Sequence, residues 1–140
     1  MYRNSTIWGV FAGVLSAALW VLSIPPFNFA EYAYIAFCPL LLWLYTKPRK
    51  SQVLMFGFLS GWVSWFVILI WLRHVTWFGT VALSAILAGL FVVWLVFASR
   101  VVGNLADRSF PVRVLLYLGI ASAWVLIEWV RTWFLWGFPW

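Results

Sequence analysis

Residues 80–99 read TVALSAILAGLFVVWLVFAS, an apolar run with no charged residue that ends at Arg100. As a helix this run would be about 30 Å long, which matches the hydrocarbon thickness of a bilayer. The whole chain has the same character, because 66% of its 140 residues are hydrophobic and only 9% are charged. A soluble chain of this length has too little interior to bury so much apolar surface. The composition therefore excludes a soluble globular domain and a disordered chain.

Four further apolar segments accompany this run, at about 7–24, 30–45, 53–72 and 114–135. The fold class we expect is an all-α integral membrane protein, a bundle of about five transmembrane helices in one domain over 1–140. The second segment is short and contains Pro39, so it is either kinked or tilted. The first segment could instead be a signal peptide, with Arg3 as its charged region. Its apolar run continues to Ile24, which is longer than usual for such a peptide and favours a retained helix.

The distribution of basic residues predicts the orientation of the bundle. The net charge is +6, and the basic residues lie mainly in short breaks between the apolar runs. A cytoplasmic N-terminus puts seven basic residues inside and leaves Arg73 and Arg131 outside, as the positive-inside rule favours. The seven are Arg3, Lys47, Arg49, Lys50, Arg100, Arg108 and Arg113. This explanation of the positive charge is simpler than nucleic-acid binding, which we do not expect.

Small residues four positions apart recur in the apolar segments. The pairs are Gly9 with Gly13, Gly57 with Gly61, Ala85 with Gly89, and Gly119 with Ala123. Such spacing lets helix backbones approach closely in lipid, where apolar burial between helices gives no net driving force. Glycine is common in membrane helices in any case, but four pairs in one short chain favour an internally packed bundle.

Four ionisable residues stand within or beside the hydrocarbon, where charge is costly: Arg73, His74, Glu128 and Arg131. Glu128 and Arg131 are three positions apart, so they share a helix face and can pair. Two interpretations remain open at this point. The pair either neutralises itself and anchors the end of a helix, which composition alone favours, or forms part of a polar cluster below an outward-facing lipid site.

The sequence gives little support for a reactive cysteine, a metal site or a nucleotide-binding site. Cys38 is the only cysteine, so no disulfide can form within the chain, and its apolar surroundings predict an inert thiol. No spacing typical of metal ligands, no phosphate-binding loop and no dinucleotide fingerprint is present. We therefore expect no metal and no cofactor. The 13 tryptophans gather partly near helix ends, and we interpret most of these as an interfacial aromatic belt.

Three stretches carry a resemblance to a known family. They are SIPPFNF at 23–29, WLRHVTWFG at 71–79, and AWVLIEWVR at 123–131 with GFPW at 137–140. In this order they are similar to the N-terminal membrane domain of bacterial apolipoprotein N-acyltransferases, and the last is the most specific. The chain resembles that domain over essentially its whole length.

The resemblance implies a bacterial inner-membrane, multi-pass protein of acyltransferase type. The family transfers an acyl chain from a phospholipid to the N-terminal diacylglyceryl-cysteine of lipoproteins, at the outer face of the membrane and through a cysteine thioester. Its catalytic Glu, Lys and Cys lie in a nitrilase-like domain, and Glu31, Glu128 and Cys38 do not match them. With that domain absent, we expect a fragment, a truncated frame or half of a split gene, inactive alone and without catalytic residues of its own.

The resemblance also supplies candidate lipid- or substrate-binding residues: Arg73, His74, Trp77, Glu128, Arg131 and Trp140. In this hypothesis Arg73 or Arg131 contacts a lipid phosphate and Glu128 holds an arginine in place. A competing hypothesis is a non-enzymatic membrane scaffold or lipid-binding module. A small transporter is a weaker third, because no ionisable residue is expected near the bilayer midplane. An in-frame continuation downstream with a nitrilase-like Glu, Lys and Cys would favour the enzyme.

Overall fold

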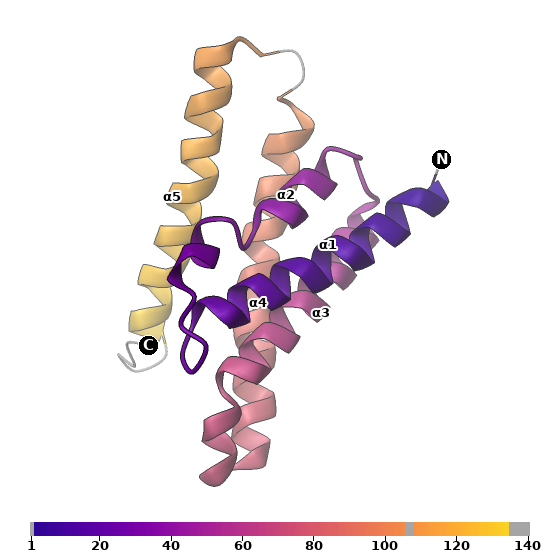
Figure 1. Ribbon diagram of the computed structural model, residues 1–140. Helices are drawn as coiled ribbons and strands as arrows, with labels where there is room; N and C mark the ends of the chain where they lie inside the picture. The colour runs from indigo at the N-terminus through magenta and orange to yellow at the C-terminus, as the bar shows by residue number, and fades with distance from the viewer. Residues whose placement is uncertain (1, 106–107, 135–140) are drawn as a thin grey trace.

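A computed structural model describes residues 2–105 and 108–134, and in this part of the chain all secondary structure is helical (Figure 1). The α-helices are α1 (Tyr2–Ser23), α2 (Cys38–Leu44), α3 (Lys50–Ile68), α4 (Trp77–Gly103) and α5 (Phe110–Phe134). Two 3₁₀ helices, η1 (Ala30–Tyr34) and η2 (Ile70–His74), precede α2 and α4. The expected all-α membrane bundle is confirmed.

Four of these helices are long and apolar enough to cross a bilayer. The qualifying stretches are Ser5–Ser23, Lys50–Ile68, Trp77–Gly103 and Phe110–Trp133. Each matches a span expected from the sequence, with ends that differ by a few residues.

The segment 30–45 differs from the single helix that its composition suggests. It consists of η1, a short link, and the seven-residue α2, which is only about 10 Å long. The break falls just before Pro39, in the first turn of α2. Proline has no N–H to donate to a preceding turn, so it is tolerated at the start of a helix and not in its interior. The segment packs along α1 and returns the chain to the end of the bundle where α1 begins (Figure 1).

Two of the four small-residue pairs make the close helix contacts that their spacing predicts. A Cβ added at Gly61 would come within 2.9 Å of Phe91 on α4, and one at Gly57 within 2.8 Å of Leu95. Gly9 lies equally close to Phe56 on α3. By contrast, nothing lies within 4 Å of the positions where Gly89 and Gly119 would carry a Cβ. The glycines of α1 and α3 therefore pack the bundle, and those of α4 and α5 do not.

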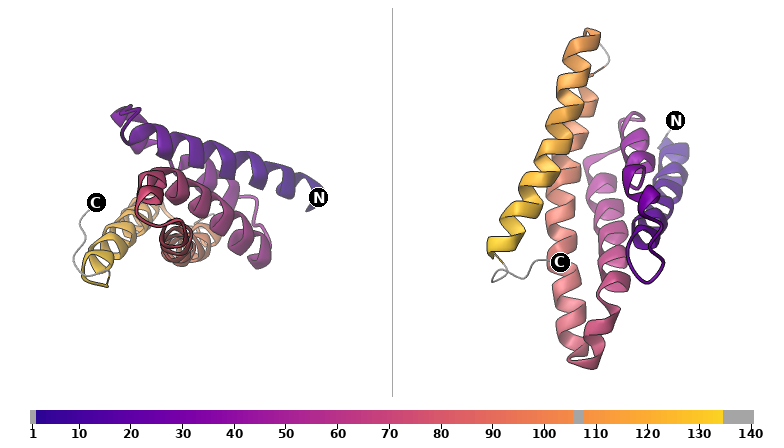
Figure 2. Two further views of the ribbon diagram at one scale, coloured as in Figure 1. Left: turned by 90° about the horizontal axis from the view of Figure 1, so that it is seen from below. Right: turned by 60° about the vertical axis from the view of Figure 1, so that its left-hand side comes forward.

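Helices α3 and α4 form the centre, with α1 on one side and α5 on the other (Figure 2). The hydroxyl of Ser60 on α3 donates a 2.9 Å hydrogen bond to the carbonyl of Gly13 on α1. On the opposite side, Trp94 Nε1 on α4 donates a 2.9 Å hydrogen bond to the carbonyl of Ile120 on α5. Helix α5 packs mainly on α4 and leaves most of its apolar surface exposed.

The start of α1, the α2–α3 link and the α4–α5 link lie toward one end of the bundle (Figure 2). Gln52 Nε2 donates a 2.8 Å hydrogen bond to Thr6 Oγ1, which ties the start of α3 to the start of α1. The basic residues of both links therefore lie at this end of the bundle, which we call the basic end. The η2 helix and the C-terminal end of α5 lie toward the opposite end. The fold is consistent with the sidedness counted from the sequence, and the cytoplasmic placement of the basic end stays a prediction.

Candidate functional site

Glu128 and Arg131 form an ion pair near the C-terminal end of α5. Arg131 Nη2 donates a 2.5 Å hydrogen bond to Glu128 Oε2. The pairing that their three-residue spacing predicts is therefore present. The two side chains differ in exposure, since that of Arg131 is 7% exposed and that of Glu128 is 30% exposed. The arginine points into the bundle, and the glutamate covers it from the surface.

Arg131 lies in a tight crevice between three helices. Its guanidinium carbon is 4.9 Å from the centre of the Trp65 ring on α3, a cation–π arrangement. The other residues lining the crevice are Leu87, Leu90 and Phe91 of α4 and Trp124, Ile127 and Glu128 of α5. The crevice leaves no room for a water molecule. Arg131 Nε and Nη1 find no hydrogen-bond acceptor among the residues that the structure describes.

A cluster of aromatic rings lies next to this crevice and joins all the long helices. We call it the aromatic core, and its members are Trp20, Phe37, Trp65, Phe91, Trp94 and Trp124. Ring centres within it lie 4.9–5.9 Å apart in the contacting pairs, with mostly edge-to-face or tilted geometry. Such pairs contribute beyond their burial, by about 0.5–1.5 kcal/mol each. The aromatic core fixes the position of Trp65, and hence the surface on which Arg131 rests.

The aromatic core is what sequence reasoning missed. The sequence interpretation assigned most of the tryptophans near helix ends to an interfacial belt, which fits the exposed Trp71, Trp77 and Trp133. It assigned no role to Trp65 and Trp94, which are buried inside spans. Their positions could have indicated burial, because both lie well within apolar runs, whereas tryptophans of an interfacial belt lie near the ends of such runs.

The remaining sequence candidates lie apart from the pair. Arg73 and His74 close η2 and Trp77 opens α4, and all three side chains are exposed. Neither Arg73 nor His74 makes a hydrogen bond or ion pair within the described ranges, so neither joins Glu128 or Arg131. Trp140 lies outside the described residues. The candidates thus divide into a buried pair on α5 and an exposed turn between α3 and α4.

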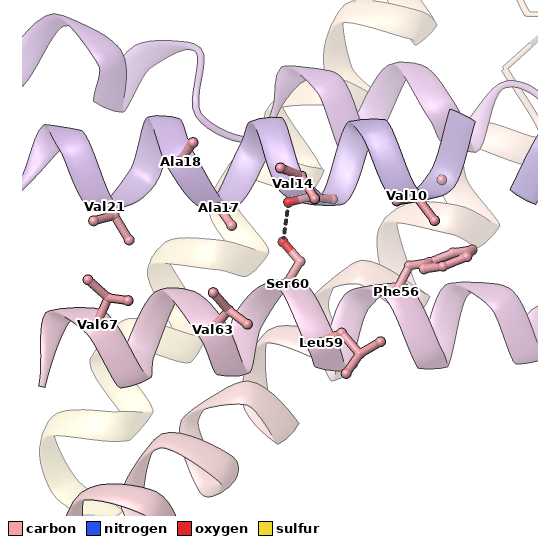
Figure 3. A pocket seen from close by; sticks show the side chains of 12 residues that line it. Val10, Val14, Ala17, Ala18, Val21, Phe56, Leu59, Ser60, Val63 and Val67 are labelled. Atoms are coloured by element: carbon pink, nitrogen blue, oxygen red, sulfur yellow. Dashed lines mark hydrogen bonds between the residues drawn. The ribbon is translucent and has the colours of Figure 1, made fainter. Parts of the chain in front are cut away.

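Two apolar grooves flank α1. The one between α1 and α3 has a volume of about 420 Å³ and is lined mainly by valine, alanine and glycine (Figure 3). The one between α1 and α2 has a similar volume, and Cys38 is among its lining residues. Among the described side chains, none that lines either groove is charged. Across the described residues, no three His, Cys, Asp or Glu side chains lie close enough to hold a metal ion.

Comparison with known proteins gives a consistent result. The family model of the apolipoprotein N-acyltransferase N-terminal domain matches residues 16–140. An apolipoprotein N-acyltransferase of Geobacter metallireducens is 34% identical over 131 residues, which cover 91% of this chain and 25% of that protein. One of Methylococcus capsulatus is 33% identical over 132 residues, 82% of this chain and 25% of that protein. No solved structure matches the chain.

The chain thus spans about a quarter of the length of the curated relatives it matches. The matched region takes in the turn at 71–79 and the Glu128–Arg131 pair, which carried the resemblance in the sequence. With its multi-pass helical bundle and a family match over most of its length, this chain belongs to the apolipoprotein N-acyltransferase family, through the family's N-terminal domain.

Proposed function

We propose that this chain is the membrane portion of an enzyme that transfers an acyl chain from a phospholipid to the N-terminal diacylglyceryl-cysteine of lipoproteins. The observation that carries the proposal is the family match over residues 16–140. The acyl transfer itself is assigned to a nitrilase-like domain outside this chain, at the outer face of the bacterial inner membrane. The bundle holds that domain at the membrane and shapes the route by which lipids reach it.

Within this proposal, the two outward arginines have different roles. Arg131 is buried, paired with Glu128 and stacked on Trp65, so it fixes the end of α5 against α3. Arg73 is exposed and makes no ion pair with the described residues, so its guanidinium is free to meet a lipid phosphate. His74 and Trp77 lie beside it and would contact the headgroup and the interface.

The test is acylation by a complete homologue that carries the same turn. Arg73→Ala should slow conversion of a diacylated lipoprotein to its triacylated form, measured by mass spectrometry of its N-terminal peptide. Arg49→Gln, which removes one charge from the basic end, is the matched control and should leave the rate unchanged. An Arg73→Ala enzyme with normal protein level and normal acylation would contradict the role of Arg73.

A non-enzymatic lipid-binding module is the competing function. The reading frame downstream of residue 140 distinguishes the two. A continuation, or an adjacent frame, that encodes a nitrilase-like domain supports the enzyme. A stop codon with no such frame nearby supports the module.

A further inference from the structure

A pocket of about 450 Å³ opens at the basic end of the bundle, where three segments of the chain meet. The α2–α3 link, the first turn of α3 and the last turns of α4 form its walls. The lining residues are Leu44, Lys47, Pro48, Lys50, Val53, Val96, Ser99, Arg100 and Gly103. Its size is within the range of pockets that bind small molecules.

Charge of one sign surrounds this pocket. Lys47, Lys50 and Arg100 line it, and no acidic side chain among the residues that the structure describes does. In the parts of the chain that the structure describes, none of these three side chains makes a hydrogen bond or ion pair. A concave site lined by cations over a low-dielectric wall focuses positive potential and attracts an anion.

The floor of the pocket is apolar. Leu44 and Val53 are buried beneath it, and Val96 is half-buried. Cations at the rim and hydrocarbon at the floor match a ligand with an anionic head and an apolar body. The pocket also lies at the end of the membrane-spanning helices, where lipid headgroups are found.

We propose that this pocket binds the phosphodiester headgroup of an anionic phospholipid. Arg100 can donate two parallel hydrogen bonds to phosphate oxygens, and the two lysines add point charges from the opposite wall. Part of the glycerol backbone and the acyl chains then contacts the apolar floor and the flank of α4. A lipid bound there bridges the α2–α3 link and the end of α4.

This inference is independent of the proposed acyl transfer. Arg100 is 23 residues beyond Trp77 on the same helix, which places the pocket about 34 Å along α4 from the Arg73 turn. The lipid bound here is therefore a structural ligand of the opposite leaflet and not the acyl donor.

The experiment is lipid titration of the detergent-purified protein, followed by native mass spectrometry with phosphatidylglycerol and phosphatidylcholine as the two probes. The intact protein should bind phosphatidylglycerol more tightly than phosphatidylcholine. Lys47→Gln/Arg100→Gln should weaken that binding about thirtyfold, since each cation at an anionic headgroup contributes roughly a factor of five. Arg100→Lys keeps the charge but loses the paired donors, so it should weaken the binding less than Arg100→Gln does.

The matched control is Arg49→Gln/Arg113→Gln, which removes the same charge from the same end of the bundle without touching the pocket. It should change the affinity less than twofold. Equal weakening by both double variants would overturn the proposal, because the basic residues would then act only as a diffuse positive surface. Equal binding of the two lipids, or displacement of the lipid by millimolar inorganic phosphate, would also overturn it.

Discussion

Arg131, on the outermost helix of the bundle, stacks 4.9 Å above the ring of Trp65, on a central helix. This contact is the principal link between α5 and α3, because α5 otherwise packs mainly on α4. Burying a charge in a bundle is costly unless the charge is paired. Glu128 supplies the counter-charge, so the stability of this contact depends on a neighbouring residue of α5.

Removing Glu128 alone should therefore destabilise the bundle more than removing both members of the pair. Glu128→Ala leaves a buried guanidinium without its counter-charge, and we expect a loss of about 3 kcal/mol in the free energy of unfolding. Glu128→Leu/Arg131→Met replaces the pair with apolar groups and should recover more than half of that loss. Denaturant unfolding in micelles measures both, and a double variant that loses as much stability as Glu128→Ala would refute the coupling.

Alanine substitutions at Gly61 and Gly89 should have opposite effects on the stability of the bundle. At Gly61 a new Cβ would lie 2.9–3.3 Å from the buried Phe91, so Gly61→Ala should cost about 1–3 kcal/mol by overpacking. At Gly89 nothing lies within 4 Å, and Gly89→Ala should be neutral or stabilising by up to about 1 kcal/mol through helix propensity. Thermal unfolding of the two variants decides this. A stable Gly61→Ala protein would show that α3 and α4 do not approach this closely.

The spans themselves could be predicted because their signal is local. An apolar run of bilayer length predicts a helix whatever surrounds it, and the run at 80–99 lies within α4. Its ends were less certain, since hydropathy fades gradually there. Thr76 determines the actual start of α4, with its Oγ1 accepting a 3.2 Å hydrogen bond from the Gly79 N–H.

The candidate site could be predicted only in part, for the same reason. The Glu128–Arg131 pair follows from spacing within one helix. The burial of Arg131 against Trp65 depends on which helices pack together, and this chain alone carries no local signal for that pairing. Pro39 indicated a break in the segment 30–45. The resulting arrangement, two short helices folded along α1, depends on the surface that α1 offers.

The aromatic core should respond to substitution quite differently from the exposed rings of the same helix. Trp124 contacts four other rings of the aromatic core, and Trp124→Ala should cost about 3 kcal/mol by leaving a cavity. Trp129, five residues on and exposed, is the control, and Trp129→Ala should stay within about 0.5 kcal/mol. Unfolding in micelles provides the comparison. Similar losses at both positions would mean that the core does not stabilise the bundle.

The orientation of the bundle can be decided by labelling engineered cysteines in spheroplasts. In a Cys38→Ala background, Val75→Cys places a thiol at the η2 turn, where the native side chain is 76% exposed. Ser51→Cys places one at the start of α3, at the basic end. Because basic links are retained in the cytoplasm, a membrane-impermeant thiol reagent should modify residue 75 and should reach residue 51 only after the membrane is opened. The reverse pattern would invert the bundle and move the Arg73 turn away from the face where the proposed acyl transfer takes place.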